Sequence, residues 1–120
     1  MSSHDPELSR APANPSAFSP EAGLTRRILA NNSKLMLVEH HMEAGWVGVR
    51  HSHPHDQLVY VLAGHLAVQC GAADKFEVRA GDSFVVRGGV EHQAWAFEAS
   101  HVLDTFTPTR EDYLPQATAR

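Results

Sequence analysis

The sequence has little of what disulfide-stapled, membrane-spanning or nucleic-acid-binding proteins require. Its 120 residues include one cysteine, Cys70, so no disulfide can form within the chain, which favours a reducing compartment. No apolar run approaches the ~20 residues of a membrane span, and the N-terminus lacks the pattern of a signal peptide. The formal net charge of -4 disfavours binding to phosphate backbones. We therefore expect a cytoplasmic protein without nucleic-acid or membrane partners.

A sustained helical period is also missing from residue 24 onward, where short stretches rich in valine, leucine and tyrosine alternate with turns. We expect strands at 25–30, 34–42, 57–63, 65–70, 75–79, 83–86, 93–97 and 101–106. Short strands at such close spacing indicate an all-β sandwich or barrel. A 13.2 kDa chain has room for one core. We expect one domain at 23–116, with a short tail at 117–120.

The first 22 residues differ in composition from the rest of the chain. They contain four of the seven prolines among serine, alanine and asparagine. Such a segment buries little apolar surface and repeatedly interrupts strand pairing. We expect residues 1–22 to form a flexible N-terminal arm.

Histidine is the unusual component, with nine copies. His51 and His53 are two residues apart, so on a strand they point to the same face. Gln57 is four residues after His53, so the alternation of side chains along a strand returns its amide to the same face. Folding can bring His92 opposite. Three imidazoles and one amide oxygen suit a single divalent zinc, nickel, iron or manganese ion. Because all four groups are neutral, the ion keeps its full charge and acts as a stronger Lewis acid.

His55 shares the parity of these histidines and is an alternative ligand. Pro54 interrupts the strand, however, and we expect His55 to point outward. The competing interpretation is that all of these are polar side chains in a wet loop, since motif matches have high false-positive rates.

Parity also sorts the apolar side chains. Those expected to point inward with the histidines are Val47, Val49, Val59 and Val61. The opposite parity directs Leu58, Tyr60 and Leu62 outward, where three large apolar side chains need cover. This favours a homodimer.

Two framing patterns carry a family resemblance. The first motif of the cupin superfamily resembles Gly45-x5-His51-x-His53-x3-Gln57-x6-Gly64, with glutamine where glutamate is common. The second motif resembles Gly81-x5-Arg87-x-Gly89-x2-His92, with arginine where proline is usual. The resemblance covers about residues 24–114. It implies a double-stranded β-helix, the jelly-roll type of barrel.

The segment from Val102 to Leu114, together with residues 51–57, is similar to the KdgF-type pectin-degradation cupins. That resemblance implies conversion of 4,5-unsaturated monouronates, released from pectin or alginate, toward a linear keto sugar acid. It also implies that Asp104, Phe106 and Arg110 are the functional trio. Asp104 shares a strand face with Phe106, and an aspartate that points into an apolar barrel near a metal is a candidate general base. Arg110 offers a planar fork for a carboxylate, and Phe106 a wall for the sugar.

Other interpretations remain open. Asp104 could pair with Arg110, Phe106 could belong to the core, and 109–112 could begin a helical turn. The same metal site would also serve a metal-dependent dioxygenase or a polyketide cyclase. A cyclase should lack a carboxylate clamp, so Arg110 discriminates the uronate enzyme from a cyclase. A non-catalytic sugar-binding module would bind uronates without turnover.

Overall fold

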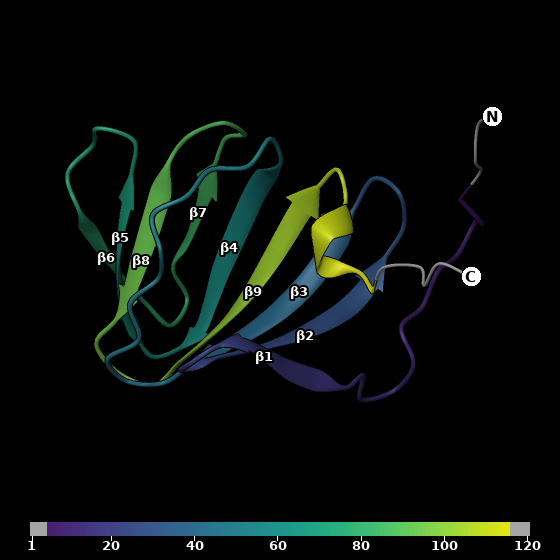
Figure 1. Ribbon diagram of the computed structural model, residues 1–120, viewed down its shortest axis with the longest axis horizontal. Coiled ribbons are helices and arrows are strands. Elements are labelled where there is room, and N and C mark those ends of the chain that lie inside the picture. The colour runs from purple at the N-terminus through teal and green to yellow at the C-terminus, as the bar shows by residue number, and fades with distance from the viewer. Residues whose placement is uncertain (1–4, 116–120) are drawn as a thin grey trace.

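The chain forms two antiparallel β-sheets that face each other, as seen in a computed structural model that describes residues 5–115 (Figure 1). The larger sheet has the order β1-β2-β3-β9-β4-β7 and the smaller sheet the order β6-β5-β8. The strands are β1 Ala17–Glu21, β2 Leu24–Asn31, β3 Met36–Met42, β4 Asp56–Ala63, β5 His65–Cys70, β6 Phe76–Arg79, β7 Ser83–Val86, β8 His92–Ala96 and β9 Ser100–Thr107, followed by the 3-10 turn η1 Glu111–Tyr113. This confirms the all-β jelly-roll fold expected from the sequence.

The strand order brings distant parts of the sequence together at β9. This strand lies between β3 and β4, with Val38 opposite Asp104 on one side and Val59 opposite Asp104 on the other. In β9 every second side chain is buried, including Val102, Asp104 and Phe106. Because side chains alternate along a strand, these residues all point between the sheets, as parity predicts.

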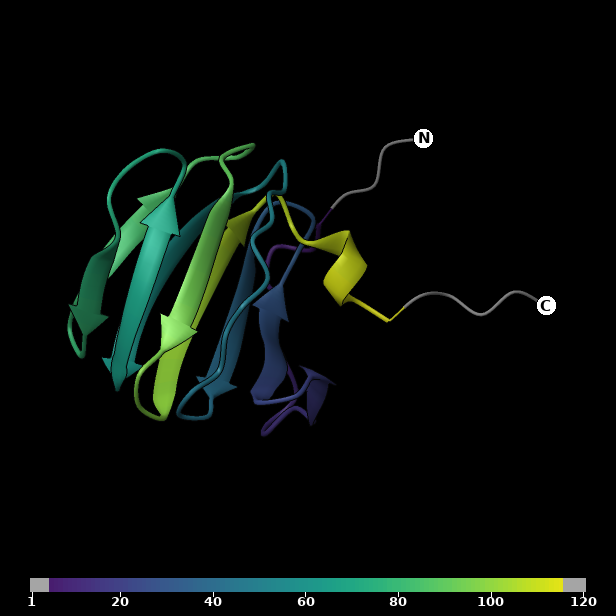
Figure 2. The same ribbon diagram turned by 60° about the vertical axis from the view of Figure 1, so that its left-hand side comes forward.

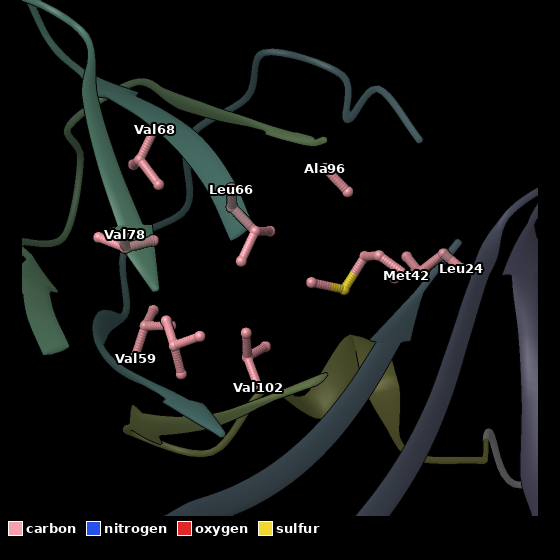
Figure 3. Close-up of a cluster of buried hydrophobic side chains, with 9 residues drawn as sticks. Leu24, Met42, Val59, Leu66, Val68, Val78, Ala96 and Val102 are labelled. Atoms are coloured by element: carbon pink, nitrogen blue, oxygen red, sulfur yellow. The ribbon is translucent and has the colours of Figure 1, made fainter. Parts of the chain in front are cut away.

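The core between the sheets is made of aliphatic side chains from both of them (Figure 3). Val59 and Val61 are buried, while Leu58, Tyr60 and Leu62 of the same strand are exposed, so the predicted faces of β4 are confirmed. A second cluster of Met36, Val38 and Phe106 lies against Tyr113 of η1.

The segment between β3 and β4 departs from the prediction. It is a long connection that runs beside β8 (Figure 2), joined to it by isolated bridges from Val47 to Trp95 and from His51 to His92. Val47 and Val49 are 56% and 73% exposed, so neither is buried between the sheets as expected. Strand parity does not extend across this segment, because a single bridge at each point does not fix a continuous pleat.

Part of the expected flexible arm is a strand. Residues 17–21 form β1, which pairs with β2 and whose register shifts between Phe18 and Glu21, where Pro20 lies. A proline is compatible with pairing here because β1 is an edge strand. Residues 1–4, the expected domain end at 116 and the tail at 117–120 lie outside the described residues. Within residues 5–115, no helix has the length and apolar character needed to cross a membrane.

Candidate metal centre

Three of the predicted ligands meet at the edge of the barrel. The main chains of His51 and His92 exchange both bridge hydrogen bonds, at 3.0 and 2.8 Å, which fixes the two residues side by side. One potential ligand atom from each of His51, His53 and His92 lies within 4.8 Å of the other two. His53 and His92 are buried and His51 is exposed. The predicted histidine cluster is therefore present in the structure.

The main chain sets the orientation of each imidazole. In His51, His53 and His92, Nδ1 lies 2.9 or 3.0 Å from a carbonyl oxygen two residues away. A carbonyl oxygen can only accept, so each Nδ1 carries the proton and donates it. Each Nε2 then presents a lone pair, as metal-binding histidines require.

Two observations show that a cation fits this cluster. His92 Nε2 is buried without a hydrogen-bond partner among the described residues. His53 Nε2 lies 3.0 Å from Gln57 Oε1, so two acceptors face each other. The amide cannot simply be reversed, because Gln57 Nε2 donates to Asp104 Oδ1 at 2.8 Å. Burial is the main reason that the pKa of His53 is lowered, which disfavours an imidazolium. A divalent ion between Nε2 and Oε1 would satisfy both acceptors.

Asp104 connects the cluster to a further histidine, His40. Its Oδ2 lies 2.6 Å from His40 Nδ1, and His40 Nε2 accepts from Arg26 Nε at 2.9 Å. The arginine can only donate, so the His40 proton is on Nδ1 and is directed at the carboxylate. Asp104 is buried and accepts from both His40 and Gln57. It does not pair with Arg110, which was the structural alternative expected from the sequence.

Arg110 is buried beside the cluster, and part of its guanidinium is already hydrogen-bonded to neighbouring side chains. It donates from Nε and Nη2 to Asp112, at 3.0 and 2.8 Å, and from Nη1 to the Tyr113 hydroxyl at 3.2 Å. A guanidinium has five N–H groups. Three of them bind Asp112 and Tyr113, so the other two, which have no partner among the described residues, are available to a ligand. Arg26 lies over the Tyr113 ring at 3.7 Å and Arg110 contacts it at 4.1 Å. Burial is the main reason that the pKa of Tyr113 is raised, so its hydroxyl stays neutral between two cations.

A cavity of about 320 Å³ joins these groups. Its lining includes His51, Gln57, His92, Asp104, Arg26, His40, Arg110 and Tyr113, together with aliphatic side chains of the core. This volume is within the range of small-molecule sites, ~300–1,000 Å³. The cavity therefore offers a candidate metal centre, a carboxylate and two guanidinium groups to one small ligand.

Phe106 is not among the residues that line this cavity in the described part of the chain. Its ring is 1% exposed and packs edge-on against His53 and Tyr113, with centroids 5.7 and 5.5 Å apart. The structure thus places Phe106 behind His53, a predicted metal ligand, and against Tyr113 of η1, not at the expected sugar-facing wall.

His55 is half-buried, where we expected it to point outward. Its Nδ1 is buried without a hydrogen-bond partner among residues 5–115, and its ring centroid lies 5.6 Å from that of His53. It does not belong to the group of three histidines that converge.

Sequence reasoning missed Arg26, His40 and Tyr113. Arg26 and His40 share inward parity with apolar neighbours, in the row of Leu24 on β2 and the row of Met36, Val38 and Met42 on β3. A histidine or arginine in such a row is a signal that could have been used. Tyr113 carries no such signal, because η1 positions it from outside the sheets.

Comparisons with known proteins agree with this geometry. A family model described as "Cupin domain" matches residues 38–103. The chain is 35% identical over 94 residues to pectin degradation protein KdgF of Dickeya dadantii, covering 77% of this chain and 84% of the relative. The structure of KdgF from Halomonas sp. matches with a TM-score of 0.78 and 37% identity, covering 82% and 93% of the two chains. An RmlC-like cupin from Shewanella frigidimarina matches with a TM-score of 0.82 and 30% identity, covering 89% and 100%.

Proposed function

This chain belongs to the cupin family, and we propose that it converts 4,5-unsaturated monouronates to the linear keto form by ring opening and tautomerisation. The observation that carries the proposal is a single cavity lined by the Asp104 carboxylate, the Arg26 and Arg110 guanidinium groups and part of the histidine cluster. An anionic sugar acid needs cations for its carboxylate and a base near its ring. The similarity to two KdgF proteins supports a role in pectin degradation.

His51, His53, His92 and the amide oxygen of Gln57 would hold one nickel, zinc, iron or manganese ion. When bound, such an ion supplies a Lewis acid that polarises the ring or anomeric oxygen. The protein's part is to keep all three Nε2 lone pairs directed inward through the Nδ1 hydrogen bonds.

Asp104 is the proposed proton carrier. Each carboxylate oxygen accepts one hydrogen bond in the structure and has a further lone pair for a substrate proton. It takes the proton of the anomeric hydroxyl as the bond between C1 and the ring oxygen breaks, which leaves an aldehyde and an enolate. Asp104 then delivers this proton to C4 of the enolate, which becomes the ketone. The reaction is an isomerisation, so no oxidant or co-reactant is required.

Arg110 is the proposed carboxylate contact, with Arg26 as the second cation. We expect the protein to accelerate the loss of ultraviolet enol absorbance of freshly released 4,5-unsaturated monouronate above its spontaneous rate. Arg110→Ala should lower kcat/KM about 10–100-fold, because a charged hydrogen bond contributes ~1.5–3 kcal/mol. Arg110→Lys should recover little of the native kcat/KM, since lysine lacks the planar fork.

Arg79→Ala is the matched control, because Arg79 is exposed at the end of β6. Circular dichroism of each variant separates loss of binding from loss of fold. Decay at the spontaneous rate with native, metal-loaded protein would exclude the uronate assignment. An oxygen electrode would then test a dioxygenase, and saturable uronate binding without turnover would indicate a sugar-binding module.

We also propose that the protein is a homodimer. Leu58, Tyr60 and Leu62 on β4 are 39–45% exposed, and Val85 lies opposite Leu58 on β7 and is 64% exposed. Together they form an apolar patch on the outer face of the larger sheet, which a second copy would cover.

Light scattering of the native protein should give twice the 13.2 kDa chain mass. Leu58→Glu with Val85→Glu should give a monomer, while Leu35→Glu, at an exposed turn, should not. A monomeric native protein would refute the dimer.

A further inference from the structure

We propose that the outer face of the larger sheet holds a second site for a divalent transition metal, formed by Glu39, His41 and His101. Glu39 and His41 are two residues apart on β3, so they share a face. His101 lies directly opposite His41 on β9. One ligand atom of each side chain lies within 4.8 Å of the other two. Two imidazoles and a carboxylate are ligands that zinc, nickel and copper accept.

The contacts show that the three groups are assembled. His101 Nε2 lies 2.7 Å and His41 Nε2 3.9 Å from the same oxygen, Glu39 Oε2. The two imidazole rings stack, with centroids 3.9 Å apart and an interplanar angle of 15°. Zinc bonds of ~2.0–2.2 Å place ligand atoms a little over 3 Å apart, so rotation of the side chains alone can close the site around an ion.

Arg27 orients the carboxylate without blocking it. Its Nη1 donates to Glu39 Oε1 at 2.8 Å, which leaves Oε2 directed toward the histidines. Metal-binding carboxylates are commonly held by such a hydrogen bond to their other oxygen. Arg27 is therefore a positioning residue for the proposed ligand Glu39.

The site is accessible and separate from the inner centre. The His41 side chain is 52% exposed, and a surface hollow bounded by Thr25, His41, Ala63 and His101 adjoins it. Such a hollow gives room for a water molecule or another ligand in the open coordination position. Because side chains alternate along β3 and β9, these ligands point away from the face that carries His40 and Asp104.

A metal bound by Glu39, His41 and His101 would cross-link β3 to β9. These strands carry His40 and Asp104, the hydrogen-bonded pair at the inner cavity. An ion that binds the folded chain and not the unfolded one raises stability by mass action. The proposed site would thus brace the two strands that position the inner carboxylate, and it does not depend on which substrate the cavity accepts.

Zinc titration of metal-free protein, followed by calorimetry and by metal analysis after gel filtration, tests the site. We expect two zinc ions per native chain and one in His53→Ala with His92→Ala. Adding His101→Asn to that double variant should weaken the remaining site more than about tenfold, since even loss of an outer contact commonly costs ~10–100-fold. His65→Asn is the matched control, because His65 faces Glu77 at 2.6 Å and Glu98 at 3.9 Å through different ring nitrogens, so these groups do not converge on one ion.

Thermal unfolding gives a second readout. Zinc should raise the Tm of the double variant, and His101→Asn should remove that rise. One zinc per native chain, unchanged by His101→Asn, would overturn the proposal. If the double variant does not fold, the same comparison between the native protein and His101→Asn alone decides, with two ions expected in the first and one in the second.

Discussion

Replacing His92 with alanine should remove the inner metal and reduce the decay of 4,5-unsaturated monouronate to its spontaneous rate. His92 Nε2 is buried with no hydrogen-bond partner in the described chain, so its lone pair is directed at a position that only an ion or a donor can fill. A Lewis acid contributes several kcal/mol to such a reaction, which corresponds to a rate effect on the order of a thousandfold. The measurement is a time course of enol absorbance, made alongside metal analysis of the same samples.

His65→Ala is the control for this prediction, since His65 is a half-buried histidine on β5, paired with Glu77 and outside the histidine cluster. Chelation of the native protein should reproduce the effect of His92→Ala. Adding metal back should restore the rate of the native protein but not that of His92→Ala. If metal-free His92→Ala still accelerated the decay, the metal would have no part in the chemistry, and the residues around Asp104 would have to account for all of it.

The sequence was sufficient for those parts of the site that depend on spacing along one segment. His51, His53 and Gln57 lie within seven residues, and the faces of β4 and β9 follow from strict alternation. It was insufficient where pairing between strands decides the outcome. His40 meets Asp104 across 64 positions, and this contact exists because β9 inserts between β3 and β4. No local pattern encodes that insertion.

The same distinction explains two of the failed predictions, the burial of Val47 and Val49 and the contact of Phe106 with the cavity. Val47 and Val49 were assigned by parity, but the segment carrying them is held to β8 by isolated bridges, so parity has no continuous strand on which to act. Phe106 was correctly placed on the inner face, but η1 covers it and sets Tyr113 against its ring. A residue pattern gives the face of a strand; the elements that pack on that face decide whether a side chain reaches the cavity.

Asp104 occupies the centre of the polar network, and its role can be separated from that of its neighbours. It accepts from Gln57, a proposed metal ligand, and from His40, which is in turn held by Arg26. A residue in this position could act as the base or could only orient Gln57. These roles predict different results for a variant that keeps the shape of the side chain and removes its charge.

We expect Asp104→Asn to bind the inner metal and lose about 10²–10⁴-fold in kcat, the range by which a positioned acid or base accelerates proton transfer. Asparagine keeps an oxygen that can accept from Gln57 or from His40, so the ligand amide can remain in place. His40→Gln is the companion variant, and it should lower kcat less, because it removes a partner of the base and leaves the carboxylate. Metal content, kcat and KM are measured for both. Were Asp104→Asn to lose its metal in proportion to its activity, the carboxylate would be an orienting group for Gln57, and the proton would have to move through another residue of the cavity.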